Sequence, residues 1–160
     1  TTRLVGSEMC IRDSGKPHAT HDEVEHSAKI AQAYDFITNK EKGFDEPISE
    51  GGSNVSGGQK QRLSIARALV RKPEIYIFDD SFSALDFKTD AILRKALKKE
   101  TTDAIVLIVA QRIGSIMDAD KIIVLDEGKV VGVGKHKELL KTCNVYHEIA
   151  LSQLTEEELA

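Results

Sequence analysis

Residues 54–63 carry the sequence Asn-Val-Ser-Gly-Gly-Gln-Lys-Gln-Arg-Leu, which leads into a helical pattern that continues to Leu69. The first N–H groups of a helix have no partners inside the helix and lie at the positive end of its dipole. Because glycine has no Cβ, Gly57 and Gly58 would let an anion approach those N–H groups closely. The stretch therefore predicts a phosphate-binding helix start. The alternative is a flexible glycine turn before an ordinary helix.

A second segment carries two carboxylates. The apolar run Ile75–Phe78 is followed directly by Asp79 and Asp80. A short, wholly apolar run is typical of a strand that is buried on both faces of a parallel sheet. Open α/β sheets bind their ligands at the carboxyl ends of such strands, and carboxylate oxygen is a preferred ligand of Mg²⁺. The sequence thus predicts a ligand site at the end of this strand.

The two segments and a third one occur in the order found in ATP-binding cassette (ABC) ATPases. Residues 54–63 resemble the signature motif of that family, with Val55 at the position where leucine is commonest. Residues 75–80 resemble its Walker B strand, and Ser83-Ala84-Leu85-Asp86 matches its D-loop. The resemblance covers roughly residues 15–153. It implies an α/β fold, a P-loop NTPase-like ABC cassette fragment, with a helical signature subdomain and the C-terminal half of the parallel-sheet core.

This resemblance divides the chain into four parts. Residues 1–14 fit no family pattern and are interpreted as a foreign or non-native segment, with a natural variant linker as the alternative. Residues 15–72 are expected to form the helical subdomain, and residues 73–145 the C-terminal half of the α/β core. Residues 146–160 are expected to form a final helix and an acidic tail.

The phosphate-binding loop of the family, G-x-x-x-x-G-K-[ST], does not occur in the sequence. Each of the pairs Gly15-Lys16, Gly128-Lys129 and Gly134-Lys135 lacks part of that pattern. The resemblance therefore implies the C-terminal part of a cassette, with the Walker A half missing. Such a chain is not expected to bind ATP tightly or to turn it over by itself.

The resemblance assigns roles to three further residues. Asp79 would bind Mg²⁺, directly or through water, and Asp80 stands where catalytically competent members have glutamate. Gln111 stands where the family has its switch histidine, and glutamine cannot carry a proton charge near neutral pH. Aspartate is one methylene shorter than glutamate, and a misplacement of about 1 Å can cost ~100-fold in rate. Together the two departures predict a site that binds ATP but hydrolyses it slowly.

The signature, in contrast, is complete. In the family two cassettes meet head to tail, so the resemblance implies that Ser56, Gly57, Gly58 and Gln59 serve the ATP site of a partner cassette. Asp86 of the D-loop would cross the same interface. This pattern resembles one half of a heterodimeric multidrug-type exporter, with ATP and Mg²⁺ as cofactors and transmembrane domains fused upstream. The implied location is the cytoplasmic face of the cell membrane.

Two other classes stay open. One is a fully active homodimeric ABC ATPase, and the other is a soluble ABC protein that acts on nucleic acid. The nucleic-acid class predicts coiled-coil arms or a basic linker, and the 160-residue sequence has a net charge of −4 and no basic run. No run approaches the ~20 apolar residues of a membrane span, and Cys10 and Cys143 form no CxxC pair.

Local patterns predict the remaining elements. Thr20 and Glu23 have the spacing of a capping box, which predicts a helix from there to about Thr38. Residues 126–129 predict a turn between two hairpin strands. We also expect an exposed helix at 90–100, buried strands at 105–110 and 121–125, a partner strand at 130–133, and helices at 137–141 and 146–154.

Some single residues also invite an interpretation. Glu50 is a candidate contact to the coupling helices of membrane domains, by resemblance. His136 is expected to cap a surface helix, and Arg62 to make surface or interdomain ion pairs. Further expectations are ion pairs for Arg67, loop or core packing for Tyr34 and Phe44, and surface positions for His18, His21 and His26.

Overall fold

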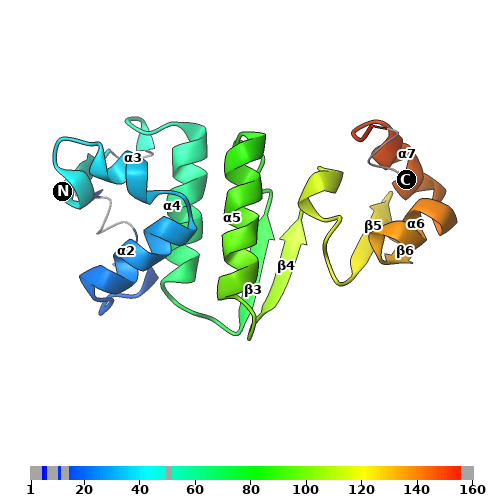
Figure 1. The fold of residues 1–160 in the computed structure, drawn as a ribbon, viewed down its shortest axis with the longest axis horizontal. Helices are drawn as coiled ribbons and strands as arrows, with labels where there is room; N and C mark the ends of the chain where they lie inside the picture. Colours follow the sequence, from blue (N-terminus) through cyan, green and yellow to red (C-terminus); the bar gives the residue numbers. More distant parts are fainter. Residues whose placement is uncertain (1–4, 7–10, 12–14, 50–51, 156–160) are drawn as a thin grey trace. The chain divides into compact units, whose positions relative to one another are not determined.

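The computed structural model describes residues 5–6, 11, 15–49 and 52–155 (Figure 1). Most of the segment 1–14 and the candidate contact Glu50 lie outside this part of the chain. The chain divides into two compact units, Thr1–Leu107 and Ile108–Ala160, with the boundary inside a strand. The division by motif at residues 72 and 73 stays a prediction.

The first unit contains four α-helices and two pairs of strands among its described residues. Strand β1 pairs antiparallel with β2, and β3 lies next to β4 in a second sheet. The connection from β3 to β4 runs through α5, the kind of helical crossover that parallel strands require. The bounds are β1 Val5–Gly6, α2 His21–Ile30, α3 Tyr34–Thr38, β2 Pro47–Ile48, α4 Gly57–Leu69, β3 Ile75–Asp79, α5 Phe87–Glu100 and β4 Ile105–Val109.

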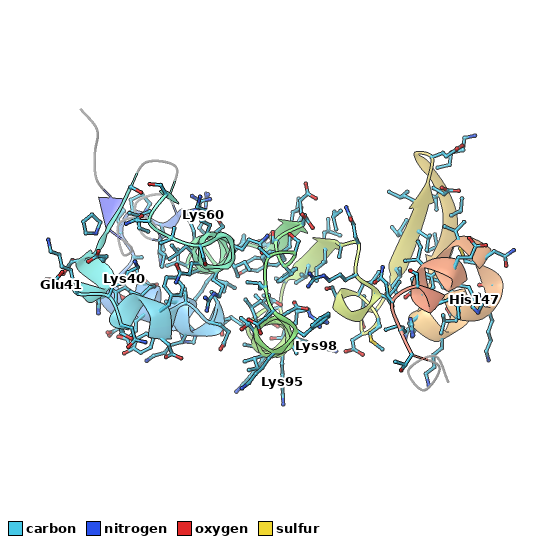
Figure 2. All side chains as sticks on the ribbon, turned by 90° about the horizontal axis from the view of Figure 1, so that it is seen from above. Lys40, Glu41, Lys60, Lys95, Lys98 and His147 are labelled. Atoms are coloured by element: carbon cyan, nitrogen blue, oxygen red, sulfur yellow. The ribbon has the colours of Figure 1, made fainter. Side chains whose placement is uncertain are left out.

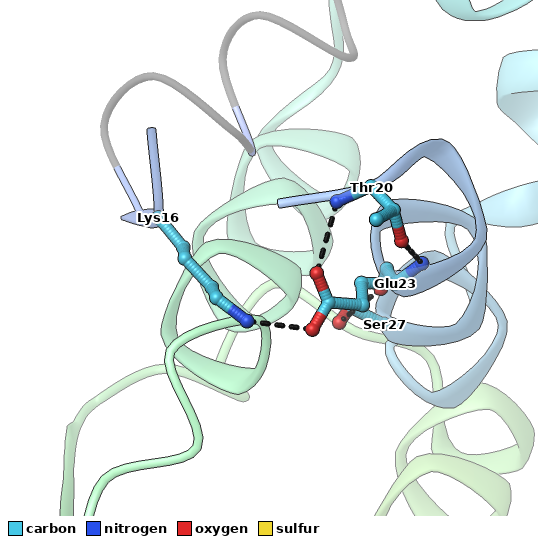
Figure 3. Close-up of polar contacts among 4 residues, drawn as sticks. All are labelled: Lys16, Thr20, Glu23 and Ser27. Atoms are coloured by element: carbon cyan, nitrogen blue, oxygen red, sulfur yellow. Dashed lines mark hydrogen bonds and ion pairs between the residues drawn. The ribbon is translucent and has the colours of Figure 1, made fainter. Parts of the chain in front are cut away.

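The start of α2 is the predicted capping box (Figure 3). The backbone N–H of Glu23 donates to Oγ1 of Thr20 at 3.2 Å, and the N–H of Thr20 donates to Oε2 of Glu23 at 2.9 Å. Lys16 adds a hydrogen bond from Nζ to Oε1 of Glu23 at 2.6 Å. These bonds lower the pKa of Glu23, with Lys16 as the largest cause and the Thr20 backbone as the next. The predicted helix start is therefore confirmed.

The predicted continuation of this helix to Thr38 is wrong, because α2 ends at Ile30 and a separate helix, α3, begins at Tyr34. Gln32 between them has a left-handed backbone with φ of 56°. The N–H of Ala33 donates to the carbonyl of Ala28 at 2.7 Å, and the N–H of Gln32 to that of Lys29 at 3.1 Å. These bonds close a Schellman motif, which ends a helix.

Buried side chains of α2, α4, β3 and α5 form the core of the first unit. Helix α4 buries Leu63, Ile65, Ala66 and Leu69, and α5 buries Leu93 and Leu97. Strand β3 contributes Tyr76 and Phe78, whose rings stack at 5.9 Å between centroids, and Phe82 packs on Phe78 at 5.5 Å. Burial raises the pKa of Tyr76.

The prediction that β3 and β4 are buried on both faces is wrong for the described structure. Ile77 on β3 is 68% exposed, whereas its neighbour Phe78 is 2% exposed. Helix α5 lies on one side of the β3–β4 pair, and no described element covers the other (Figures 1 and 2). The solvent-exposed apolar side chains of these two strands are Ile75, Ile77, Ile105, Leu107 and Val109.

Helix α5 begins earlier than the predicted residue 90. Asp86 is its N-cap, and Oδ1 of Asp86 accepts from the N–H of Thr89 at 2.9 Å. Asp90 is buried and accepts from Nε of Arg94 at 3.1 Å, so the helix is not exposed all round. Its outer side is exposed, and Lys95 and Lys98 extend there (Figure 2).

The second unit is a hairpin with two helices. Strands β5 (Ile122–Asp126) and β6 (Lys129–Gly134) pair antiparallel, as the turn at residues 126–129 predicted. Glu127 and Gly128 have φ of 46° and 75°, as a type I′ turn requires. The hairpin buries Ile122 and Val124 but leaves its other face bare, so the predicted burial of this strand is also wrong. Helices α6 (His136–Thr142) and α7 (Asn144–Leu151) complete the unit.

His136 differs from its expected surface position. The N-cap of α6 is Lys135, and His136 follows as the first helical residue, 8% exposed. Nδ1 of His136 lies 2.8 Å from the hydroxyl of Tyr146, which is itself buried. Burial raises the pKa of Tyr146. The pair therefore joins α6 to α7 inside the core of the second unit.

Within the described residues, no helix is both long enough and apolar enough to cross a membrane.

Replacement of Thr20 by alanine removes the cap of α2 and should lower the free energy of unfolding by about 1 kcal/mol. Urea unfolding followed by circular dichroism measures the change. Thr102 is exposed and lies outside every helix and strand, so Thr102→Ala is the matched control and should leave the midpoint unchanged. Equal midpoints for Thr20→Ala and the wild type would contradict the assigned cap.

The lowered pKa of Glu23 predicts a pH dependence of stability. A carboxyl group whose pKa is lower in the folded chain stabilises the fold above its unfolded pKa of about 4.3. That contribution is lost as the pH falls through the lowered pKa in the folded state. Glu23→Gln should therefore make the loss of stability below about pH 5 less steep in urea titrations from pH 7 to pH 3. An identical pH profile in the variant would show that Glu23 is not the group responsible.

Candidate functional site

The start of α4 is fixed by a second capping box. Oγ of Ser56 accepts from the N–H of Gln59 at 3.2 Å, and Oε1 of Gln59 accepts from the N–H of Ser56 at 2.9 Å. Ser56 is thus the N-cap, and Gly57 is the first residue of the helix. We call Ser56–Gln59 the signature tip. The predicted helix start at the glycines is confirmed.

The capping box leaves three donors at the signature tip. In the part of the chain that the structure describes, the N–H groups of Gly57 and Gly58 have no acceptor, and the hydroxyl hydrogen of Ser56 is not donated. Ser56 and Gly57 are exposed, and Gly58 is half-buried. Three donors at the positive end of a 13-residue helix suit an anion with several oxygens, such as a phosphate.

The two glycines of the tip face different surroundings. A Cβ on Gly58 would lie 2.9 Å from the carbonyl oxygen of Ala84, closer than real Cβ atoms come to a backbone atom. A Cβ on Gly57 would lie 3.7 Å from Cβ of Ala84, an ordinary contact. Gly58 is therefore required by packing within the chain, whereas the chain itself leaves room for a side chain at position 57.

The two predicted carboxylates lie where β3 ends. Asp79 is the last residue of the strand and Asp80 follows it, and both are exposed. Asp80 has a left-handed backbone with φ of 47°, a conformation that Asp adopts more readily than most residues. The backbone turns sharply here, and we call Asp80–Ala84 the post-strand turn. Asp80 thus lies in the same unit as the signature tip.

Gln61 connects these two parts of the site. Its Nε2 donates to the carbonyl of Asp80 at 3.1 Å and to Oγ of Ser83 at 3.0 Å. Its Oε1 accepts from the N–H of Ala84 at 3.0 Å. No local sequence pattern predicts this role of Gln61, because its partners lie 19 to 23 positions away.

Arg62, the next residue of α4, contacts a different segment of the chain. It donates from Nη1 to the carbonyl of Gln32 at 2.6 Å and lies over the ring of Phe36, 4.7 Å from its centroid. Burial lowers the pKa of Arg62. The expected ion pair is therefore not the main role of Arg62, which instead joins α4 to the break between α2 and α3.

Asp86 already has partners within its own chain. One carboxylate oxygen accepts from the N–H of Thr89 at 2.9 Å and the other from its hydroxyl at 2.7 Å. These hydrogen bonds lower the pKa of Asp86. The residue is exposed, so the same carboxylate is also accessible from outside the chain.

Gln111 belongs to the second unit, whereas the other candidate residues that the structure describes belong to the first. Its carbonyl accepts from Nε2 of Gln153 at 2.8 Å, and Oε1 of Gln153 accepts from the N–H of Ile113 at 2.9 Å. Gln153, a residue that the sequence analysis did not single out, thus anchors the segment that carries Gln111. The side chain of Gln111 is exposed.

The described residues include Asp79, the candidate ligand of Mg²⁺, at the end of β3. Among them, no cluster of three or more His, Cys, Asp or Glu side chains could hold a metal ion. Mg²⁺ commonly takes one or two carboxylates and fills its other positions with water and substrate phosphates. One exposed carboxylate at a strand end, such as Asp79, is enough for that role.

Comparison with known proteins agrees with this geometry. Residues 5–83 match the family model described as ABC transporter. An uncharacterized ABC transporter ATP-binding protein of Mycobacterium tuberculosis (strain ATCC 25618 / H37Rv) is 44% identical over 145 residues, which are 89% of this chain and 25% of that protein. A protein of Staphylococcus aureus (strain NCTC 8325 / PS 47), provisionally named as a multidrug export ATP-binding/permease protein, is 44% identical over 135 residues, 84% of this chain and 23% of that protein.

A solved structure shares the fold. A bacterial Atm1-family ABC exporter with ATP bound superimposes with a TM-score of 0.88 at 33% sequence identity, over 98% of this chain and 28% of that one. The chain therefore spans about a quarter of the length of the relatives that it matches. The chain belongs to the ATP-binding cassettes of the ABC transporter family.

Proposed function

We propose that the chain is the signature-bearing part of a cassette that drives an ATP-powered membrane exporter. In this proposal the signature tip binds the terminal phosphate of an ATP molecule held by a second cassette. The observation that carries it is the set of three donors without an acceptor among the described residues, from Ser56, Gly57 and Gly58, at the start of α4. Because Ser56 and Gly57 are exposed and Gly58 is only half-buried, a neighbouring molecule can reach these donors.

The carboxylates of the same chain serve its own half of an ATP site. Asp79 would hold Mg²⁺ together with phosphate oxygens and water. Asp80 would orient the water that attacks the terminal phosphate, since such a residue must lie within hydrogen-bond reach of that water. Gln111 can donate a hydrogen bond to a phosphate oxygen but cannot take up a proton there. The chain's own site is therefore proposed to be the slower one in a heterodimer.

The transport role is proposed from the names of the relatives. One is provisionally named a multidrug export ATP-binding/permease protein, and the solved structure is an ABC exporter. We infer that membrane domains and a second cassette are the partners, at the cytoplasmic face of the membrane. The exposed apolar faces of β3–β4 and of β5–β6 are of a kind seldom left in water, as expected of a chain that is part of a larger assembly.

The two glycines of the signature tip allow folding and ATP binding to be separated. Gly58→Ala should lower the free energy of unfolding by about 1–2 kcal/mol, because overpacking against the Ala84 carbonyl costs more than helix propensity returns. Gly57→Ala should leave stability unchanged or slightly raised, since its Cβ has room. It should nevertheless reduce ATP turnover of the assembled full-length protein at least tenfold, because the methyl group occupies the space that the phosphate needs.

Thermal unfolding and steady-state phosphate release of the two variants provide the measurements. Full ATP turnover in a stably folded Gly57→Ala variant would contradict the proposed phosphate contact. ATP turnover of the wild-type full-length protein, measured without any second subunit, distinguishes a homodimer from a heterodimer. Turnover at a normal rate under that condition would favour a fully active homodimeric ATPase.

The proposed weakness of the chain's own site predicts a gain of function. The double variant Asp80→Glu, Gln111→His restores the longer carboxylate and a titratable ring, and it should raise ATP turnover of the assembled protein. The gain can approach ~100-fold, the effect of moving a catalytic group by about 1 Å. Asp103→Glu, which adds the same methylene at an exposed position outside the site, is the control. An unchanged rate in the double variant would show that these two residues do not limit hydrolysis.

A further inference from the structure

The side chain of Gln61 uses both ends of its amide within one short segment. The nitrogen donates to Asp80 and Ser83, and the oxygen accepts from Ala84, at distances of 3.0 to 3.1 Å. A primary amide offers two N–H donors and one oxygen acceptor, so all parts of the group take part. All three partners belong to the post-strand turn.

The post-strand turn depends on bonds of this kind. Asp80 has a φ of 47°, in the left-handed region that few non-glycine residues adopt. The bond from the N–H of Ser83 to the carbonyl of Asp80 is long, at 3.5 Å. The carbonyl of Asp80 therefore relies on side-chain donors, namely Nε2 of Gln61 and Oγ of Ser83, both at 3.1 Å.

The same segment meets the signature tip. Gly58 lies so close to the carbonyl of Ala84 that a Cβ could not be placed between them without a shift. The N–H of Ala84 is held by Gln61, one turn further along α4. Ala84 is thus held by α4 at two points, and the post-strand turn cannot move away from α4 without breaking these contacts.

We propose that Gln61 is a positioning residue that keeps the post-strand turn, and with it the Asp80 carboxylate, at a fixed place on the signature helix. Its catalytic consequence rests on the proposed function, in which the signature tip and Asp80 serve two different ATP molecules. Gln61 then links those two sites inside one chain. A shift of α4 at the tip would move the turn that carries Asp80, and a shift of that turn would move the tip.

Glutamine suits this position better than its near relatives. Methionine has a similar length but neither donates nor accepts strongly. Glutamate keeps an oxygen for the N–H of Ala84 but places it, without donors, beside the carbonyl of Asp80. Gln61→Met therefore removes every bond to the turn, whereas Gln61→Glu removes the donor bonds and leaves one acceptor.

The test uses the assembled full-length protein that contains this chain and has two readouts. The first is amide hydrogen exchange at Ala84, resolved to single residues. Gln61→Met should speed this exchange by about tenfold, and Gln61→Glu should speed it less.

The second readout is ATP turnover, for which Gln61→Met should lower kcat about tenfold while KM for ATP changes less than about twofold. KM for ATP should change little because Gln61 contacts no group that is proposed to bind nucleotide. The rate kcat should fall because a displaced Asp80 slows the chemical step.

Lys95→Met is the control, since it makes an apolar change at an exposed residue of another helix, α5, and should alter neither readout. If Gln61→Met does not assemble, Gln61→Glu must still lower kcat with KM kept. Unchanged exchange at Ala84 in the folded variants would overturn the inference, and so would faster exchange with unchanged kcat. If the wild type hydrolyses no ATP, the proposed function fails and the link to catalysis falls with it, while the exchange result still decides whether Gln61 holds the turn.

Discussion

The reciprocal hydrogen bonds between Ser56 and Gln59 fix where α4 begins, and much of the site depends on that start. They satisfy one N–H of the first turn and leave the N–H groups of Gly57 and Gly58 without an acceptor among the described residues. The same start places Gly58 against the carbonyl of Ala84. One local pairing thus defines both the outer surface offered to an anion and the inner contact with the post-strand turn.

Helix α4 is then held from both sides. Gln61 binds the turn after β3, and Arg62 binds the break between α2 and α3. Helix α4 also packs against α2 and buries Leu63, Ile65, Ala66 and Leu69. Motion at the tip is therefore opposed by contacts to two separate segments, which is the arrangement expected of a surface that must be rigid when a neighbouring molecule binds.

The sequence predicted well what local patterns determine. The cap at Thr20, the start of a helix at Gly57 and the turn at Glu127 and Gly128 were confirmed, because each depends on residues within three positions of one another. The break at Gln32 was not predicted, because the helical spacing of apolar residues continues on both sides of it. The residue that supports the break, Arg62, lies thirty positions away in the sequence. The role of Gln61 was not predicted for the same reason. The prediction that β3, β4 and β5 are buried was wrong. An apolar run indicates that a strand tends to be covered, but it does not show which segment covers it. The roles of Asp79, Asp80, Asp86 and Gln111 stay predictions.

The central claim is that the signature tip grips a phosphate that another cassette carries. The most direct test is a structure of the assembled full-length protein with ATP trapped by a slowly hydrolysed analogue. The account predicts that Oγ of Ser56 and the N–H groups of Gly57 and Gly58 lie about 3 Å from oxygens of a terminal phosphate bound to the opposite cassette. A signature tip that faces solvent in that state, with no phosphate opposite, would contradict it.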